Sequence, residues 1–212
     1  MNLEKCILAQ PTVTFLGHTV DSKGIRPEKV NAIKQFPLPS SKLDVQHLLG
    51  MVNFYRQFLP RLAHIARPLM DSLSKAKKDF TITLEMITTI NQVKDAISKA
   101  TLLVHPRRDA TLSITTDTSD TTIGGVLHQH HQGRLEPLSF FSHRLSNPES
   151  RYSTFDRELL AVAAVVRKFQ HFIEGRKVII YTDHKPLTSS ITKAHFTSTW
   201  SLRAERHLLF SS

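Results

Sequence analysis

The sequence predicts a mixed α/β or α+β protein, in which a helical region precedes a sheet with flanking helices. In the first half, apolar residues recur with the 3.6-residue period of helices after one short hairpin. In the second half, three strand-like segments precede a long helix and a further strand, an order typical of a mixed sheet with a crossover helix. The polar, proline-containing segment 105–110 is the expected junction between the halves.

The hairpin and one helix are expected before residue 40. Residues 12–25 (TVTFLGHTVDSKGI) contain two strand-like segments, with turn chemistry at Gly17 and in DSKG. Pro27 is expected to begin the helix in RPEKVNAIKQF, because proline is favoured in a first turn, and the sequence PLP is expected to stop it.

Three further helices are expected before the junction. Residues 40–60 (SSKLDVQHLLGMVNFYRQFLP) keep the helical period, with Ser40 or Ser41 as cap, Pro60 as end and Tyr55 on the core side. Residues 61–73 and 85–100 each predict one more helix, the latter through a stripe made of Met86, Ile90, Val93 and Ile97.

The second half predicts three consecutive strands, at residues 111–117, 123–129 and 135–142. A helix from about 153 to 173 follows, then a strand at 177–183 and a short helix beyond it. The histidine-rich stretch 128–134 (HQHHQGR) is interpreted as a polar hairpin turn, with a zinc site as the alternative.

Composition favours an intracellular globular protein. With 212 residues, 40% hydrophobic and 22% charged, the chain can bury one sizeable core or two small ones. No apolar run approaches the roughly 18 residues that span a membrane, and the start lacks the apolar core of a signal peptide. A single cysteine, Cys6, fits a reducing compartment, so we expect the cytoplasm or nucleus and no membrane partner.

The net charge of +10 favours a polyanionic partner, although it also serves solubility. The excess is larger in the first half, where the predicted helices carry most of the Lys and Arg residues. This basic face is a candidate for tracking nucleic-acid phosphates, and Arg56 is a candidate contact.

Three carboxylates lie where predicted elements meet their core. Asp117 and Asp183 each end a strand, and Glu158 lies on the flank of the apolar stripe of the long helix. If the strands are neighbours and the helix packs on them, the acids converge, and Mg²⁺ is the ion that such oxygen ligands suit, with Mn²⁺ as an alternative. The alternatives are structural: Asp117 as a turn residue, Glu158 as a flank charge and Asp183 as a helix cap.

The residues also resemble a known family. The blocks TTDTSDTTIGGVLHQ, SHRLSNPESRYSTFDRELLAV and IIYTDHKPL resemble the ribonuclease H domain of gypsy-type LTR-retrotransposon reverse transcriptases. The first half is similar to the preceding parts of the same polyproteins: residues 5–33 to the end of the polymerase palm and the start of the thumb, and residues 48–69 to the thumb and connection helices. The resemblance covers nearly the whole chain.

The resemblance implies three regions: the end of the palm with a primer-grip hairpin (1–25), a helical thumb and connection (26–108), and a C-terminally incomplete ribonuclease H-like domain (109–212). It implies that Asp117, Glu158 and Asp183 are metal-binding catalytic residues. It further implies contacts to nucleic acid from the primer-grip residues. His184, which directly follows Asp183, is a candidate for proton transfer or for contact with the substrate, and a role in the local geometry of the motif is the alternative. The primer-grip residues are Phe15, Leu16, Gly17 and His18.

Two departures from the family pattern matter. The paired-aspartate polymerase motif is absent from this sequence, so the chain alone is not expected to polymerise DNA. The family's fourth acid, in a C-terminal block, is also absent, and the chain stops before that block. Activity on an RNA–DNA hybrid is therefore the leading hypothesis, with the upstream polymerase portion of the polyprotein as a further partner. The alternatives are an inactive nucleic-acid-binding remnant and a protein-interaction module.

Overall fold

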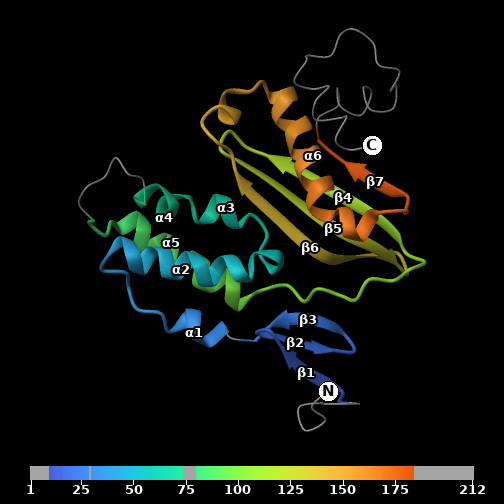
Figure 1. Ribbon diagram of the computed structural model, residues 1–212, viewed down its shortest axis with the longest axis horizontal. Coiled ribbons are helices and arrows are strands. Elements are labelled where there is room, and N and C mark those ends of the chain that lie inside the picture. Colours follow the sequence, from blue (N-terminus) through green and yellow to red (C-terminus); the bar gives the residue numbers. More distant parts are fainter. Residues whose placement is uncertain (1–9, 29, 74–79, 184–212) are drawn as a thin grey trace, which may run out of the picture.

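The computed structural model describes residues 10–28, 30–73 and 80–183. Figure 1 shows a small sheet and a group of helices beside a larger sheet that is covered on one face by a long helix. The mixed α/β class predicted from the sequence is confirmed. None of the helices in the described ranges has the length and apolar character that crossing a membrane requires.

The N-terminal sheet has three antiparallel strands, one more than expected. They are β1 (Thr12–Phe15), β2 (His18–Asp21) and β3 (Gly24–Pro27). Pro27 therefore ends a strand and does not begin a helix; it lies on an edge strand, where its missing N–H costs no ladder hydrogen bond. The first helix, α1 (Val30–Lys34), is correspondingly short.

The helical region, α1 to α5, is more broken than the period predicted. The helix α2 (Lys42–Phe54) is capped by Ser41, which forms a capping box with Asp44. Hydrogen bonds from Ser40 to the Asp44 carboxylate hold the pKa of that carboxyl below its usual range. It gives way at Tyr55 to the short 3₁₀ helix η2 (Arg56–Phe58), and Leu59, which precedes Pro60, is extended.

The segment 61–73 forms two helices, not the one expected. They are α3 (Leu62–Ile65) and α4 (Arg67–Ser72), separated at Ala66. Pro68 explains the break, because it has no N–H to donate to the carbonyl of His64 in a continuous helix. The helix α5 (Leu84–Ser98) agrees with its prediction and contacts α1, α3 and α4. It shares with α2 a buried core that includes Val45, Leu48, Val52, Ile90, Val93 and Ile97.

The large sheet consists of β4 (Thr111–Thr118), β5 (Thr122–His131), β6 (Arg134–Arg144) and β7 (Val178–Tyr181) in the order β6-β5-β4-β7. After β6 come the 3₁₀ helix η3 (Glu149–Arg151) and α6 (Thr154–Ile173), which crosses over so that β7 joins β4 in parallel. The predicted histidine-rich turn is wrong in part: the histidines extend β5, and the turn is Gln132–Gly133. The short helix expected after β7 lies outside the described residues.

The helix α6 approaches the sheet closely at Gly125. A Cβ atom on Gly125 would lie 2.5 Å from one methyl group of Val165, whereas a Cβ atom on the adjacent Gly124 would meet nothing closer than 3.7 Å. Val165 is fully buried in the core between α6 and the sheet, which includes Leu112, Ile114, Leu127 and Phe169.

We therefore predict that Gly125→Ala lowers the free energy of unfolding by about 1–3 kcal/mol, because the extra methyl group overpacks this contact. Gly124→Ala is the matched control and is expected to be close to neutral. Urea denaturation of both variants measures the difference. Equal stability of the two would contradict the close packing of α6 on β5.

Candidate acidic site and nucleic-acid interface

The three predicted acids lie at one end of the large sheet. Asp117 is on β4, and Asp183 follows the end of β7 by two residues. Because β4 and β7 are parallel and pair Thr115 with Tyr181, the two aspartates leave the sheet at the same end. Glu158 is in the first turns of α6, which covers the sheet (Figure 1).

Asp117 and Glu158 do not face each other. Leu112 and Ile114 point into the core beneath α6, so the two-residue alternation of a strand places Thr118 on that face and Asp117 on the opposite face. Glu158 is buried, at 5% exposure, and accepts a hydrogen bond from the Thr118 hydroxyl at 2.5 Å. The Asp117 side chain is 60% exposed, and its carboxylate lies 3.6 Å from the guanidinium of Arg61.

The carboxylate oxygens present are the donors that Mg²⁺ prefers, but their positions do not fit such an ion. Within the described part of the chain, no group of three or more His, Cys, Asp or Glu side chains is close enough together to hold a metal. Asp117 and Glu158 are directed to opposite faces of β4, each toward another partner. The predicted ligands thus share one end of the sheet without forming a metal site.

The predicted primer-grip residues form an exposed turn. Phe15 and Leu16 are 65% and 70% exposed, and Gly17 adopts a positive φ of 73°. The Tyr55 hydroxyl donates to the Gly17 carbonyl at 3.3 Å, and the His18 ring lies within about 6 Å of the rings of three aromatic side chains at the end of α2 and in η2: Phe54, Tyr55 and Phe58. The turn is therefore held against the helical region while its apolar side chains face outward.

Arg56 joins the helical region to the large sheet. Its guanidinium donates to the Ser142 carbonyl on β6 at 2.9 Å and lies over the Phe141 ring, 5.8 Å from the ring centre. The backbone N–H of Ala63 donates to the Ser142 hydroxyl at 2.9 Å. Arg56 thus has a structural role beside its predicted contact with nucleic acid. His184, the remaining predicted contact, lies outside the described residues.

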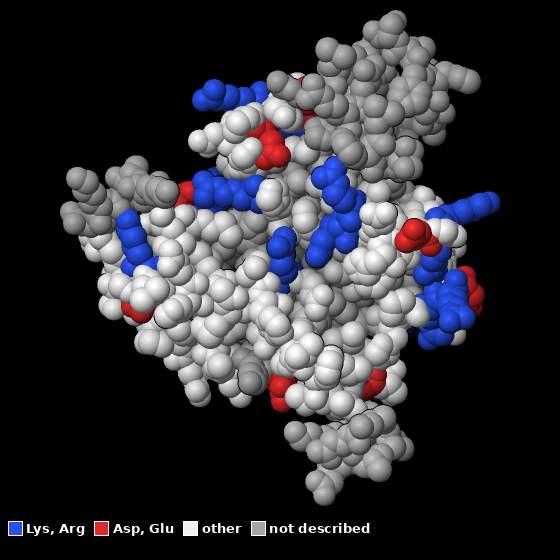
Figure 2. Space-filling model, viewed as in Figure 1, with Lys and Arg blue, Asp and Glu red and all other residues white. Residues whose placement is uncertain are grey.

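Basic side chains are prominent on the face of the molecule drawn in Figure 2. In Figure 2, Lys and Arg surfaces lie across the middle of the view, over the region between the helices and α6, whereas Asp and Glu surfaces are smaller and scattered. Arg61 lies beside Asp117, at the acidic end of the large sheet. Residue spacing alone could not identify Arg61 as a neighbour of Asp117, because only the fold brings the two residues together.

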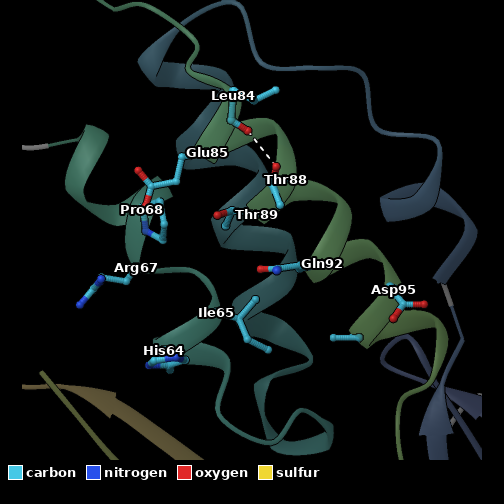
Figure 3. A pocket seen from close by; sticks show the side chains of 11 residues that line it. His64, Ile65, Arg67, Pro68, Leu84, Glu85, Thr88, Thr89, Gln92 and Asp95 are labelled. Atoms are coloured by element: carbon cyan, nitrogen blue, oxygen red, sulfur yellow. Dashed lines mark hydrogen bonds between the residues drawn. The ribbon is translucent and has the colours of Figure 1, made fainter. Parts of the chain in front are cut away.

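Two other features lie apart from the acids. A cavity of about 770 Å³ between α4 and α5 is lined by His64, Arg67, Glu85 and Asp95 among others, and contains none of the predicted site residues (Figure 3).

On β5, burial and then the neighbouring His130 lower the pKa of His128. Neither position belongs to a metal-binding group among the described residues, so the zinc alternative gains no support.

The bond between Thr118 and Glu158 can be tested directly. Thr118→Val keeps the shape of the side chain and removes the donor from a buried carboxylate, so we expect the free energy of unfolding to fall by about 1–3 kcal/mol. Thr118→Ser retains the hydroxyl and is expected to lose less. Denaturant titration of both variants decides the point, and equal losses would show that packing, not the hydrogen bond, is responsible.

Comparison with known proteins places these observations in a family. A family model described as "RNase H-like domain found in reverse transcriptase" matches residues 82–180, which extend from the N-terminal end of α5 to β7. Among solved structures, the foamy viral protease-reverse transcriptase in complex with RNA/DNA hybrid has a similar fold, with a TM-score of 0.77 and 22% sequence identity. The match covers 98% of this chain and 28% of the foamy viral chain. This likeness supports the fold.

Curated relatives extend the match to most of the chain. The Pol polyprotein from transposon 297 of Drosophila melanogaster is 35% identical over 88% of this chain, and that from transposon gypsy of the same species is 36% identical over 89%. The chain spans about a fifth of the length of these relatives, 18% and 19%. Residues 82–180 therefore belong to the RNase H-like domain family of reverse transcriptases, in a chain related over most of its length to the Pol polyproteins of gypsy-type LTR transposons.

Proposed function

We propose that this chain is the thumb and ribonuclease H-like part of a retrotransposon reverse transcriptase, and that it binds RNA–DNA hybrid and hydrolyses the RNA strand. The observation that carries the proposal is the placement of Asp117, Asp183 and Glu158 at one end of a ribonuclease H-like sheet. The net charge of +10 suits a polyanionic substrate. A hybrid would be held through its backbone and near-A-form groove, not through base sequence.

In this proposal the three regions act on one substrate. The exposed turn at Phe15 and Leu16 contacts one strand of the duplex, the helices follow its phosphates, and the acidic end of the large sheet meets the RNA strand. The upstream polymerase portion of a Pol polyprotein is the natural partner for the N-terminal sheet. Divalent metal is the cofactor that the acids imply, Mg²⁺ first and Mn²⁺ second, although the carboxylates in the described part of the chain are not grouped around one point.

The same observation favours a second candidate, a protein that binds hybrid without cleaving it. The Asp117 carboxylate lies close to Arg61, and Glu158 is buried against Thr118, so neither is arranged for catalysis. Binding is therefore expected to be strong at low salt and cleavage weak. Both candidates require nucleic-acid binding, and they differ only in hydrolysis.

Incubation of the protein with a labelled RNA–DNA hybrid and Mg²⁺ or Mn²⁺ separates the candidates. We expect slow cleavage by the wild type, and Asp117→Asn is expected to reduce the rate by about a hundredfold or more, as loss of a catalytic group does. Asp120→Asn is the matched control, because Asp120 is an exposed carboxylate three residues away that pairs with Arg157. Salt-sensitive binding without cleavage would establish the second candidate, and cleavage that survives Asp117→Asn would exclude this acid from catalysis.

A further inference from the structure

The segment from Arg56 to Ala63 is fixed to the large sheet at both of its ends. Arg56 donates to the Ser142 carbonyl, and the N–H of Ala63 donates to the Ser142 hydroxyl, each at 2.9 Å. Between these contacts the chain turns at Arg61, which has a left-handed backbone with φ of 54° and ψ of 26°. This conformation is uncommon and costly for a residue other than glycine, so the surrounding contacts determine it.

The anchored turn places Arg61 at the acidic end of the sheet. Ser142 pairs with Gly124, and Gly124 pairs with Asp117, so the three residues form one row across β6, β5 and β4. Gly124 is the central residue of this row. Because it has no side chain, it places nothing between the helical region and Asp117. The Arg61 guanidinium lies 3.6 Å from the Asp117 carboxylate.

Arg61 is available for another anion, unlike two neighbouring arginines. Arg56 is engaged by a backbone carbonyl and an aromatic ring, and Arg144 contacts Asp71 at 2.6 Å. The Arg61 contact is longer, and its side chain is 68% exposed. Ion pairs this exposed are weak, so a phosphate can compete with the carboxylate for the guanidinium.

We infer that Arg61 is a phosphate-binding residue supplied by the helical region to the acidic end of the ribonuclease H-like sheet, where it holds a backbone phosphate of the bound duplex beside Asp117. The inference rests on the proposed nucleic-acid binding and deepens it by naming a contact. A phosphate near Asp117 is repelled by that carboxylate, and a guanidinium offsets the repulsion while offering paired donors to the phosphate oxygens. Without substrate, Arg61 remains next to Asp117.

The test measures binding of a labelled RNA–DNA hybrid to the full chain in buffer with EDTA, over a series of salt concentrations. Each phosphate contact contributes about 0.9 to the slope of log affinity against log salt, so Arg61→Ala is expected to lower the steepness by about that amount. Lys99→Ala is the matched control: Lys99 and its partner Asp95 are 74% and 59% exposed, close to the 68% and 60% of Arg61 and Asp117. The control is expected to leave the slope unchanged.

Two further variants separate a specific contact from a general effect of charge. Arg61→Lys keeps the charge and is expected to restore the slope while binding more weakly than wild type, since lysine lacks the planar pair of donors. Asp117→Asn removes the competing carboxylate and is expected to tighten binding in the same metal-free buffer. Circular dichroism of each variant confirms that the fold is retained.

The outcomes distinguish this inference from the function on which it rests. A lower slope for Arg61→Ala but not for Lys99→Ala supports it. Equal slopes for the two variants, with salt-sensitive binding by the wild type, overturn the inference and leave the proposed function standing. Wild-type protein that shows no salt-sensitive binding of the hybrid overturns both.

Discussion

The arrangement of the two halves depends on one strand, β6, that contributes to two cores. Successive side chains of a strand point to opposite faces, so Phe140 packs against the core of the helical region while Phe141 packs against the cores beneath α6. The next residue, Ser142, accepts hydrogen bonds from Arg56 and Ala63. Apolar packing and hydrogen bonds thus both hold the helical region against β6. This packing brings Arg61 close to Asp117.

The depth at which α6 lies on the sheet is fixed in a similar way. Val165 occupies the space above Gly125, and Glu158 lies seven residues earlier, two turns along the same face of the helix. The position of one small residue on β5 therefore brings the Glu158 carboxylate close to the end of β4, where the Thr118 hydroxyl donates to it. A buried carboxylate needs such donors, because its transfer from water is costly. Close packing and the hydrogen bond support each other.

Most elements of the fold could be predicted from local patterns. The strict periods of α5, α6 and the first three strands of the large sheet, and the apolar stripe beside Glu158, were sufficient. Pro27 was ambiguous, because proline suits a first helical turn and an edge strand equally. Two further signals are present in the sequence: Pro68 interrupts the segment 61–73, and the alternation from Leu112 turns Asp117 away from α6. The approach of Arg61 to Asp117 had no local signal, because it depends on the packing of the helices on β6.

The acidic end of the sheet creates a need for positive charge close by. The ends of β4 and β7 supply carboxylates, and two such groups repel any phosphate that approaches them. A positive group close to the acids offsets this repulsion, whether it is a divalent cation or a basic side chain supplied by another element. The helical region meets the sheet at Ser142 and carries Arg61 on a strained turn beside that contact. Under the proposed function, the joint between the halves is thus where the substrate's requirement for positive charge and the packing requirement of the fold coincide.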